Sequence, residues 1–149
     1  MVTAVITLTR MGIHSTMKMT GWIQSADFGM KNLAEMDLAN ALRAFTDHDW
    51  NSERQLEANL LSRKQESSPA GFGLDHPNGH KLWIGPLSLE TCWVMFTKRS
   101  NRKLLGFIPL PNHDLESESV PREMIDELIV EFYQDMTAKY AKLESIKNL

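Results

Sequence analysis

The stretch from Ala70 to Leu110 constrains the fold of this chain most strongly, because it reads as four consecutive antiparallel strands. Its first turn contains Asn78-Gly79, a dipeptide typical of tight β-hairpins because both residue types tolerate positive φ. Trp93 is expected in the core, because the third strand is apolar on both alternating sets of positions. The expected strands are Ala70–Asp75, His80–Pro86, Glu90–Lys98 and Lys103–Leu110.

Two segments of helical period precede this meander. The first, Leu33–Phe45, carries one apolar stripe, formed by Leu38, Ala41, Leu42 and Phe45. The second begins near Ser52, which with Gln55 three residues later forms a capping-box pattern, and it ends before Pro69. Its buried side is expected to consist of Leu56, Leu60 and Leu61. Trp50 lies between the two segments and is expected to join them.

The end of the chain predicts a third helix, and its beginning allows two interpretations. Asn112–Ser119 reads as an acidic loop, and Pro121 fits the first turn of a long helix. The apolar stripe of that helix comprises Ile125, Leu128, Phe132, Met136, Tyr140 and Leu143. Near the amino terminus, Val2–Leu8 and Lys18–Ile23 read as strands, or the first thirty residues are an extension.

These segments predict one α+β domain over residues 1–149. Its expected plan is two N-terminal helices, a four-stranded antiparallel meander sheet, and a long C-terminal helix packed on the sheet. The length and the apolar fraction of 42% are those of an ordinary globular domain. The net charge of −3 argues against duplex nucleic acid as a partner. With Cys92 as its one cysteine and no long apolar segment, the chain is expected to be cytoplasmic.

Three histidines are the candidates for metal chemistry. His76 and His80 flank the hairpin turn, and His48 lies between two aspartates, so converging imidazoles would form a metal site. The favoured interpretation is that they are solvated turn residues, because no Glu follows His76 as a metalloprotease helix requires. No cofactor or metal is expected. Cys92 lies in mid-strand without a basic neighbour, which favours a buried inert thiol over a nucleophile.

The basic turn Lys98–Lys103 is a candidate for single-stranded nucleic acid. Phe96 and Phe107 flank it, and aromatic side chains beside cations stack bases. A charged turn that keeps a hairpin solvated is the favoured interpretation. Nucleotide binding is not expected, since Gly71-Phe72-Gly73 leads into a strand and not into a helix.

The densest charge cluster is acidic and lies between Asp114 and Glu131. Such a cluster is either a solvated surface or a face that steers a basic protein partner. Tryptophans favour the second interpretation, because aromatic anchors dominate binding hot spots, and Trp83 is expected to be the most exposed of the four. The expected partner-binding residues are Trp83, Asp114, Glu116, Glu118, Glu123 and Glu127.

In the order of its elements and in its charge, the chain resembles the small, acidic, cysteine-poor proteins that bacteria make to bind one other protein. The likeness covers no diagnostic residues, so it is an analogy of plan. It implies a non-enzymatic, immunity-type inhibitor that neutralises a partner toxin. The alternatives are a homodimeric chaperone of a secreted effector and, from another class, a small metal-dependent enzyme that uses His48, His76 and His80.

Overall fold

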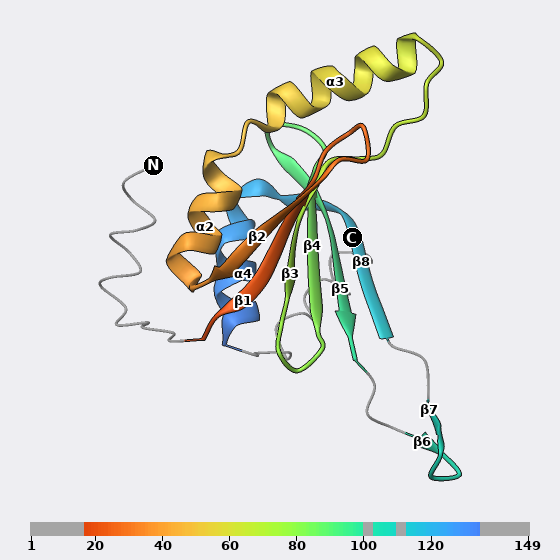
Figure 1. The fold of residues 1–149 in the computed structure, drawn as a ribbon. Helices are drawn as coiled ribbons and strands as arrows, with labels where there is room; N and C mark the ends of the chain where they lie inside the picture. Colours follow the sequence, from red (N-terminus) through yellow and green to blue (C-terminus); the bar gives the residue numbers. More distant parts are fainter. Residues whose placement is uncertain (1–16, 100–102, 110–112, 135–149) are drawn as a thin grey trace.

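The computed structural model of the chain describes residues 17–99, 103–109 and 113–134. Its centre is a six-stranded, fully antiparallel sheet with the strand order β2-β1-β3-β4-β5-β8 (Figure 1). The strands are β1 (Met19–Gln24), β2 (Met30–Met36), β3 (Gly71–Asp75), β4 (Lys81–Pro86), β5 (Thr91–Lys98) and β8 (His113–Pro121).

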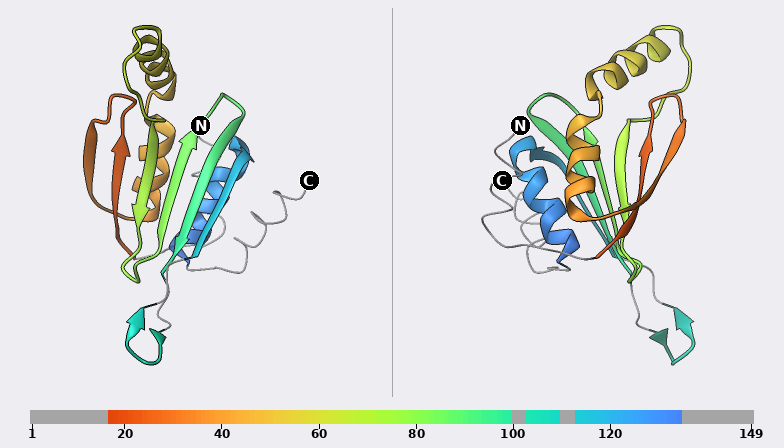
Figure 2. Two further views of the ribbon diagram at one scale, coloured as in Figure 1. Left: turned by 90° about the vertical axis from the view of Figure 1, so that its right-hand side faces the viewer. Right: turned by 60° about the vertical axis from the view of Figure 1, so that its left-hand side comes forward.

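Helices cover one face of this sheet. α2 (Leu38–Asp47) and α4 (Ile125–Tyr133) lie side by side on it, whereas α3 (Trp50–Ser62) extends past one end of the sheet (Figure 2). The core fills the space between the sheet and these two helices. Its fully buried side chains include Phe72, Leu74, Ile84, Val94, Ile125 and Ile129. No helix of the described residues is long and apolar enough to cross a membrane.

The α+β class agrees with the sequence, but the expected plan is wrong: the sheet has six strands, and two of them precede the helices. Residues 30–36 form β2 instead of the start of a helix. β2 is an edge strand in which Met36 is the one buried residue, so its sequence shows no alternating pattern. The expected strand at Lys18–Ile23 is confirmed as β1, and Val2–Leu8 lies outside the described residues.

The last sheet strand also differs from the prediction. Lys103–Leu110 was expected to be the fourth strand, but β6 (Lys103–Leu104) and β7 (Ile108–Pro109) form a separate hairpin that projects from the sheet (Figure 1). Leu105 and Gly106 have φ of 53° and 79°, which turns the chain back within this segment. The place beside β5 belongs to β8, a segment expected to be an acidic loop.

The helices confirm the apolar stripe of the first predicted helix and correct the cap of the second. All four stripe residues of α2 are buried. α3 begins earlier than expected, because the Asp49 carboxylate accepts from the backbone N–H of Ser52 (3.0 Å). Trp50 does join the two helices: its indole N–H donates to the carbonyl of Phe45 (2.8 Å). The expected leucine face of α3 is not buried, and Leu61 is 59% exposed.

The remaining predictions concern the hairpin turn and the C-terminal helix. The turn is confirmed: Gly79 has φ of 91°, and its N–H donates to the carbonyl of His76 (2.9 Å). Pro121 is followed by a 3₁₀ turn, η1 (Arg122–Met124), and then by α4. The first three residues of the predicted stripe are buried in α4, and the last three lie outside the described residues.

Candidate functional site

The two faces of the sheet differ in what covers them. α2 and α4 pack on one face, and no helix of the described chain packs on the other, which we call the open face (Figure 2). Strand alternation sends Trp22, Trp83 and Trp93 to the open face, because their neighbours Ile23, Ile84 and Val94 are buried in the core. Three of the four tryptophans therefore lie outside the main core, which contradicts the expectation that Trp93 is a core residue.

The three indoles form a continuous tryptophan row across β1, β4 and β5. The rings of Trp22 and Trp83 lie 5.4 Å apart at 70°, and those of Trp83 and Trp93 lie 5.1 Å apart at 88°. Both pairs have the edge-to-face geometry that the charge distribution of aromatic rings favours. All three side chains are half-buried, so each keeps part of its apolar surface in contact with solvent.

Glycines of β3 make room for this row. Trp22 pairs with Gly73, and a Cβ atom built at Gly73 would overlap the Trp22 ring. A Cβ atom at Gly71 would likewise overlap the Trp83 indole. The indoles therefore lie against bare backbone, which fixes their orientation without covering their outer surface. The row is a preformed aromatic surface on a rigid sheet.

Carboxylates line the β8 edge of the open face. Asp114, Glu116 and Glu118 alternate along β8 and are exposed, whereas Ser117 between them is buried. We call these three residues the acidic edge. It is continuous with the tryptophan row, since Glu116 pairs with Met95 across the strands and accepts a hydrogen bond from the indole N–H of Trp93 (2.5 Å).

A pocket of about 510 Å³ opens between the tryptophan row and the acidic edge. Its walls are mainly apolar, and among the described residues that line it Glu118 is the one charged group. The lining residues are Pro69, Ala70, Trp83, Gly85, Leu87, Trp93, Glu118 and Ser119. We call this cavity the tryptophan pocket. Its size and its composition of apolar walls with few polar groups are those of a ligand-binding cavity.

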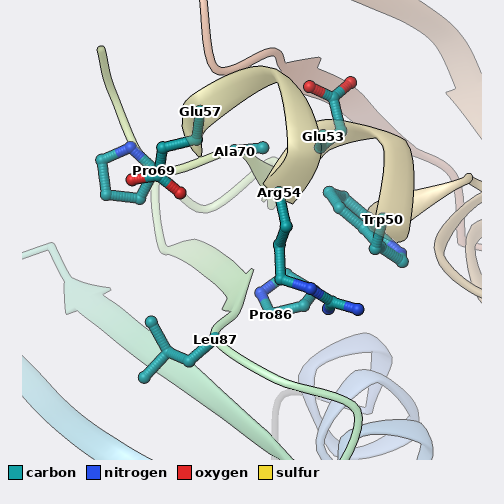
Figure 3. Close-up of a pocket in the computed structure, with 8 residues that line it drawn as sticks. All are labelled: Trp50, Glu53, Arg54, Glu57, Pro69, Ala70, Pro86 and Leu87. Carbon is teal, nitrogen blue, oxygen red and sulfur yellow. The ribbon is translucent and has the colours of Figure 1, made fainter. Parts of the chain in front are cut away.

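A neighbouring pocket of about 170 Å³ lies where α3 meets the end of the sheet (Figure 3). One of its lining residues is a cation, Arg54, and the side chain of Arg54 extends over Pro86. The Arg54 guanidinium donates to Asn51 (3.2 Å). This second pocket is smaller and partly occupied by its own side chain, so it offers a ligand less than the tryptophan pocket does.

The structure brings four of the six expected partner-binding residues together. Trp83 and the three residues of the acidic edge share the open face. Glu123 and Glu127 do not join them, because they follow β8 in η1 and in α4, which belongs to the helical layer. Sequence reasoning missed Trp22 and Trp93, although their alternation with buried Ile23 and Val94 is the signal that places them.

The residues considered for catalysis and for nucleic acid are arranged differently. His48 bonds to Glu53 (3.1 Å) beside the α2–α3 junction, whereas His76 and His80 lie at the β3–β4 turn, at the opposite end of the sheet (Figure 1). Within the described ranges, no three His, Cys, Asp or Glu side chains form a group that could hold a metal ion. The three-histidine site, which the sequence left open as an alternative, is therefore not assembled among these residues. Burial raises the pKa of the Cys92 thiol to about 11, which keeps it protonated and unreactive at neutral pH.

The basic turn also lacks one of its expected aromatic partners. Phe96 is buried in the core and its ring packs against Phe132 (6.0 Å between centroids), so it offers no surface for a nucleic acid base. Phe107 is 71% exposed on the projecting hairpin. A stacking platform for single-stranded nucleic acid would therefore rest on one phenylalanine instead of two.

Comparison with protein-family models, with curated proteins and with solved structures found no match for this chain.

Proposed function

We propose that this protein is a non-catalytic binding module, an immunity-type inhibitor that binds a basic partner toxin through the open face of its sheet. One observation carries the proposal: the tryptophan row and the acidic edge lie side by side on the one broad sheet face that the described helices leave uncovered. Aromatic anchors beside a charged rim are the usual anatomy of a protein–protein interface.

The two parts of this surface contribute differently to binding. Each tryptophan still exposes apolar area, and an indole at the centre of an interface commonly contributes about 2 kcal/mol or more to the binding free energy. Because glycine backbone and ring-to-ring contacts already fix the indoles, little side-chain entropy is lost when a partner covers them. The acidic edge attracts a positively charged partner, accelerates its approach and excludes acidic ones.

The proposal is tested by site-specific photo-cross-linking in cells that naturally produce the protein. Benzoyl-phenylalanine replaces Asp114 or Glu118 on the open face, and in matched control variants it replaces exposed acids of the helical layer, Asp47 or Glu123. We expect one basic protein to be cross-linked from both open-face positions and from neither control position. Cross-linking of a partner from the control positions alone would contradict the proposal.

The inhibitory role is tested with the partner so identified. Purified wild-type protein should inhibit the activity of the partner at a one-to-one ratio, and the affinity should fall as salt is added, because salt screens charges at a solvated rim. A partner that keeps its full activity in the complex would contradict the inhibitory role but not the binding surface.

A further inference from the structure

We propose that the tryptophan pocket is a subsite for an arginine side chain of the partner protein. This inference rests on the proposed function, since it names the group that the open face recognises. It depends on three features of the described lining of the pocket: two indole walls, the Glu118 carboxylate and further apolar side chains.

The indole walls favour a planar cation. Trp83 and Trp93 stand nearly perpendicular, 88° apart with centroids 5.1 Å apart, and both indoles line the pocket. Among aromatic side chains, indole faces attract cations most strongly, and a guanidinium also stacks on them through its own flat face. A lysine ammonium is more strongly hydrated and lacks that flat face.

The carboxylate of the pocket supplies the opposite charge. Glu118 lines the cavity beside Ser119, whose hydroxyl adds an acceptor. Glu116 is already bonded to the Trp93 indole N–H, so it holds one wall in place while Glu118 faces the cavity. A carboxylate accepts two parallel hydrogen bonds from a guanidinium, a geometry that only arginine offers.

Other apolar residues that line the pocket suit the aliphatic part of the same side chain. Leu87 is 49% exposed and lines the pocket together with Pro69 and Ala70. Arginine carries three methylene groups between its backbone and its charge, and such stems pack along apolar surface while the charged group reaches a partner. The pocket thus matches each part of an arginine side chain in turn.

The test uses the full-length protein and short blocked peptides, acetyl-Gly-Arg-Gly-amide and the same peptide with citrulline, the neutral isostere of arginine. Binding is followed through the indole N–H resonances of the tryptophans in ¹⁵N NMR spectra. We expect the arginine peptide to shift the Trp83 and Trp93 resonances with a millimolar dissociation constant. The Trp50 resonance should not move, because that indole is buried and bonded to Phe45.

Two variants test the role of the carboxylate. Glu118→Gln should weaken the arginine peptide roughly tenfold, the effect of losing one charge-assisted hydrogen bond. Glu123→Gln removes the same charge from the helical layer and should leave the dissociation constant unchanged. The citrulline peptide should bind both variants and the wild type equally weakly.

Equal binding of the arginine and citrulline peptides, or resonance shifts that bypass Trp83 and Trp93, would overturn the subsite. Its failure is distinguishable from failure of the proposed function. A partner cross-linked from the open face would still establish the binding surface if the arginine peptide did not bind. Conversely, if the arginine peptide bound but no partner were cross-linked, the pocket would still be an arginine-binding site, and the proposed protein-binding role would be contradicted.

Discussion

The same strands form both faces of the sheet, but the side chains of the two faces differ in how deeply they are buried. On the covered face, Phe72, Ile84 and Val94 are fully buried beneath α2 and α4. On the open face, Trp22, Trp83 and Trp93 are only half-buried, although they are larger and offer more apolar area. The largest apolar side chains of the strands thus lie outside the core, although burial in the core would contribute most to stability.

This difference separates stability from recognition. Removing a covered side chain leaves a cavity under two helices, so the cost falls on folding. Removing an open-face side chain leaves a site that water can fill, so the free energy of unfolding changes little. The main loss is apolar surface that a partner would contact.

The largest effect is expected on the covered face. Phe72→Ala should lower the free energy of unfolding by about 3–5 kcal/mol, because the ring is fully buried and packs against Phe45 (5.9 Å between centroids). Met95→Ala on the open face should cost less than half as much. Urea unfolding followed by circular dichroism measures both changes. Equal losses would show that the two faces are packed alike.

An intermediate effect is expected where glycines hold the tryptophan row. Gly73→Ala places a methyl group inside the Trp22 ring and should cost about 1–3 kcal/mol, the usual penalty of overpacking. Gly85→Ala is the matched control, because its Cβ would meet only ordinary contacts at 3.4 and 3.6 Å. That control should change the unfolding free energy by less than about 0.5 kcal/mol. Tryptophan fluorescence should shift in the first variant alone, since the row is displaced.

The smallest effect concerns the pH dependence of the covered face. Burial holds the pKa of Cys92 near 11, against 9.0 for a free thiol. Between these values the folded protein binds the extra proton, so stability is complete below pH 9.0 and falls as the pH rises toward 11. The urea midpoint of Cys92→Ala should therefore fall less between pH 9.0 and pH 11 than the midpoint of the wild type does. Burial also raises the pKa of Tyr133, but this residue is present in both proteins, so its contribution to the difference between them cancels. Identical losses would place the thiol in contact with water.

How much the sequence could predict depended on the local signals that a strand carries. β3 and β4 were found because the Asn78-Gly79 turn marks their hairpin, and β5 because it is rich in the apolar and aromatic residues of an interior strand. β2 lies at the edge with most of its side chains exposed, and its Ala34-Glu35-Met36 favours a helix by propensity, so it was mistaken for one. In that segment the sheet overrides local preference.

The same reasoning explains the candidate site. The acidic edge was identified by charge but assigned to a loop, because Asp and Glu are depleted in strands. Its alternation with Leu115 and buried Ser117 is the signal that was overlooked. Only the pairing of β8 with β5 brings those carboxylates beside Trp93, and pairing between distant segments is not readable from local sequence. Glu123 and Glu127 were grouped with them by charge alone.

The central claim is that the open face, and not the helical layer, is where the partner binds. Its most direct test is the dissociation constant, by calorimetry, of the cross-linked partner for two double variants of equal charge change. Glu116→Lys with Glu118→Lys should weaken binding by at least about a hundredfold, because two charges at the contact are reversed. Asp47→Lys with Glu123→Lys should change it less than about threefold, since these exposed charges lie in α2 and η1 and not on the open face. Equal losses in the two variants, or a larger loss in the second, would contradict the account.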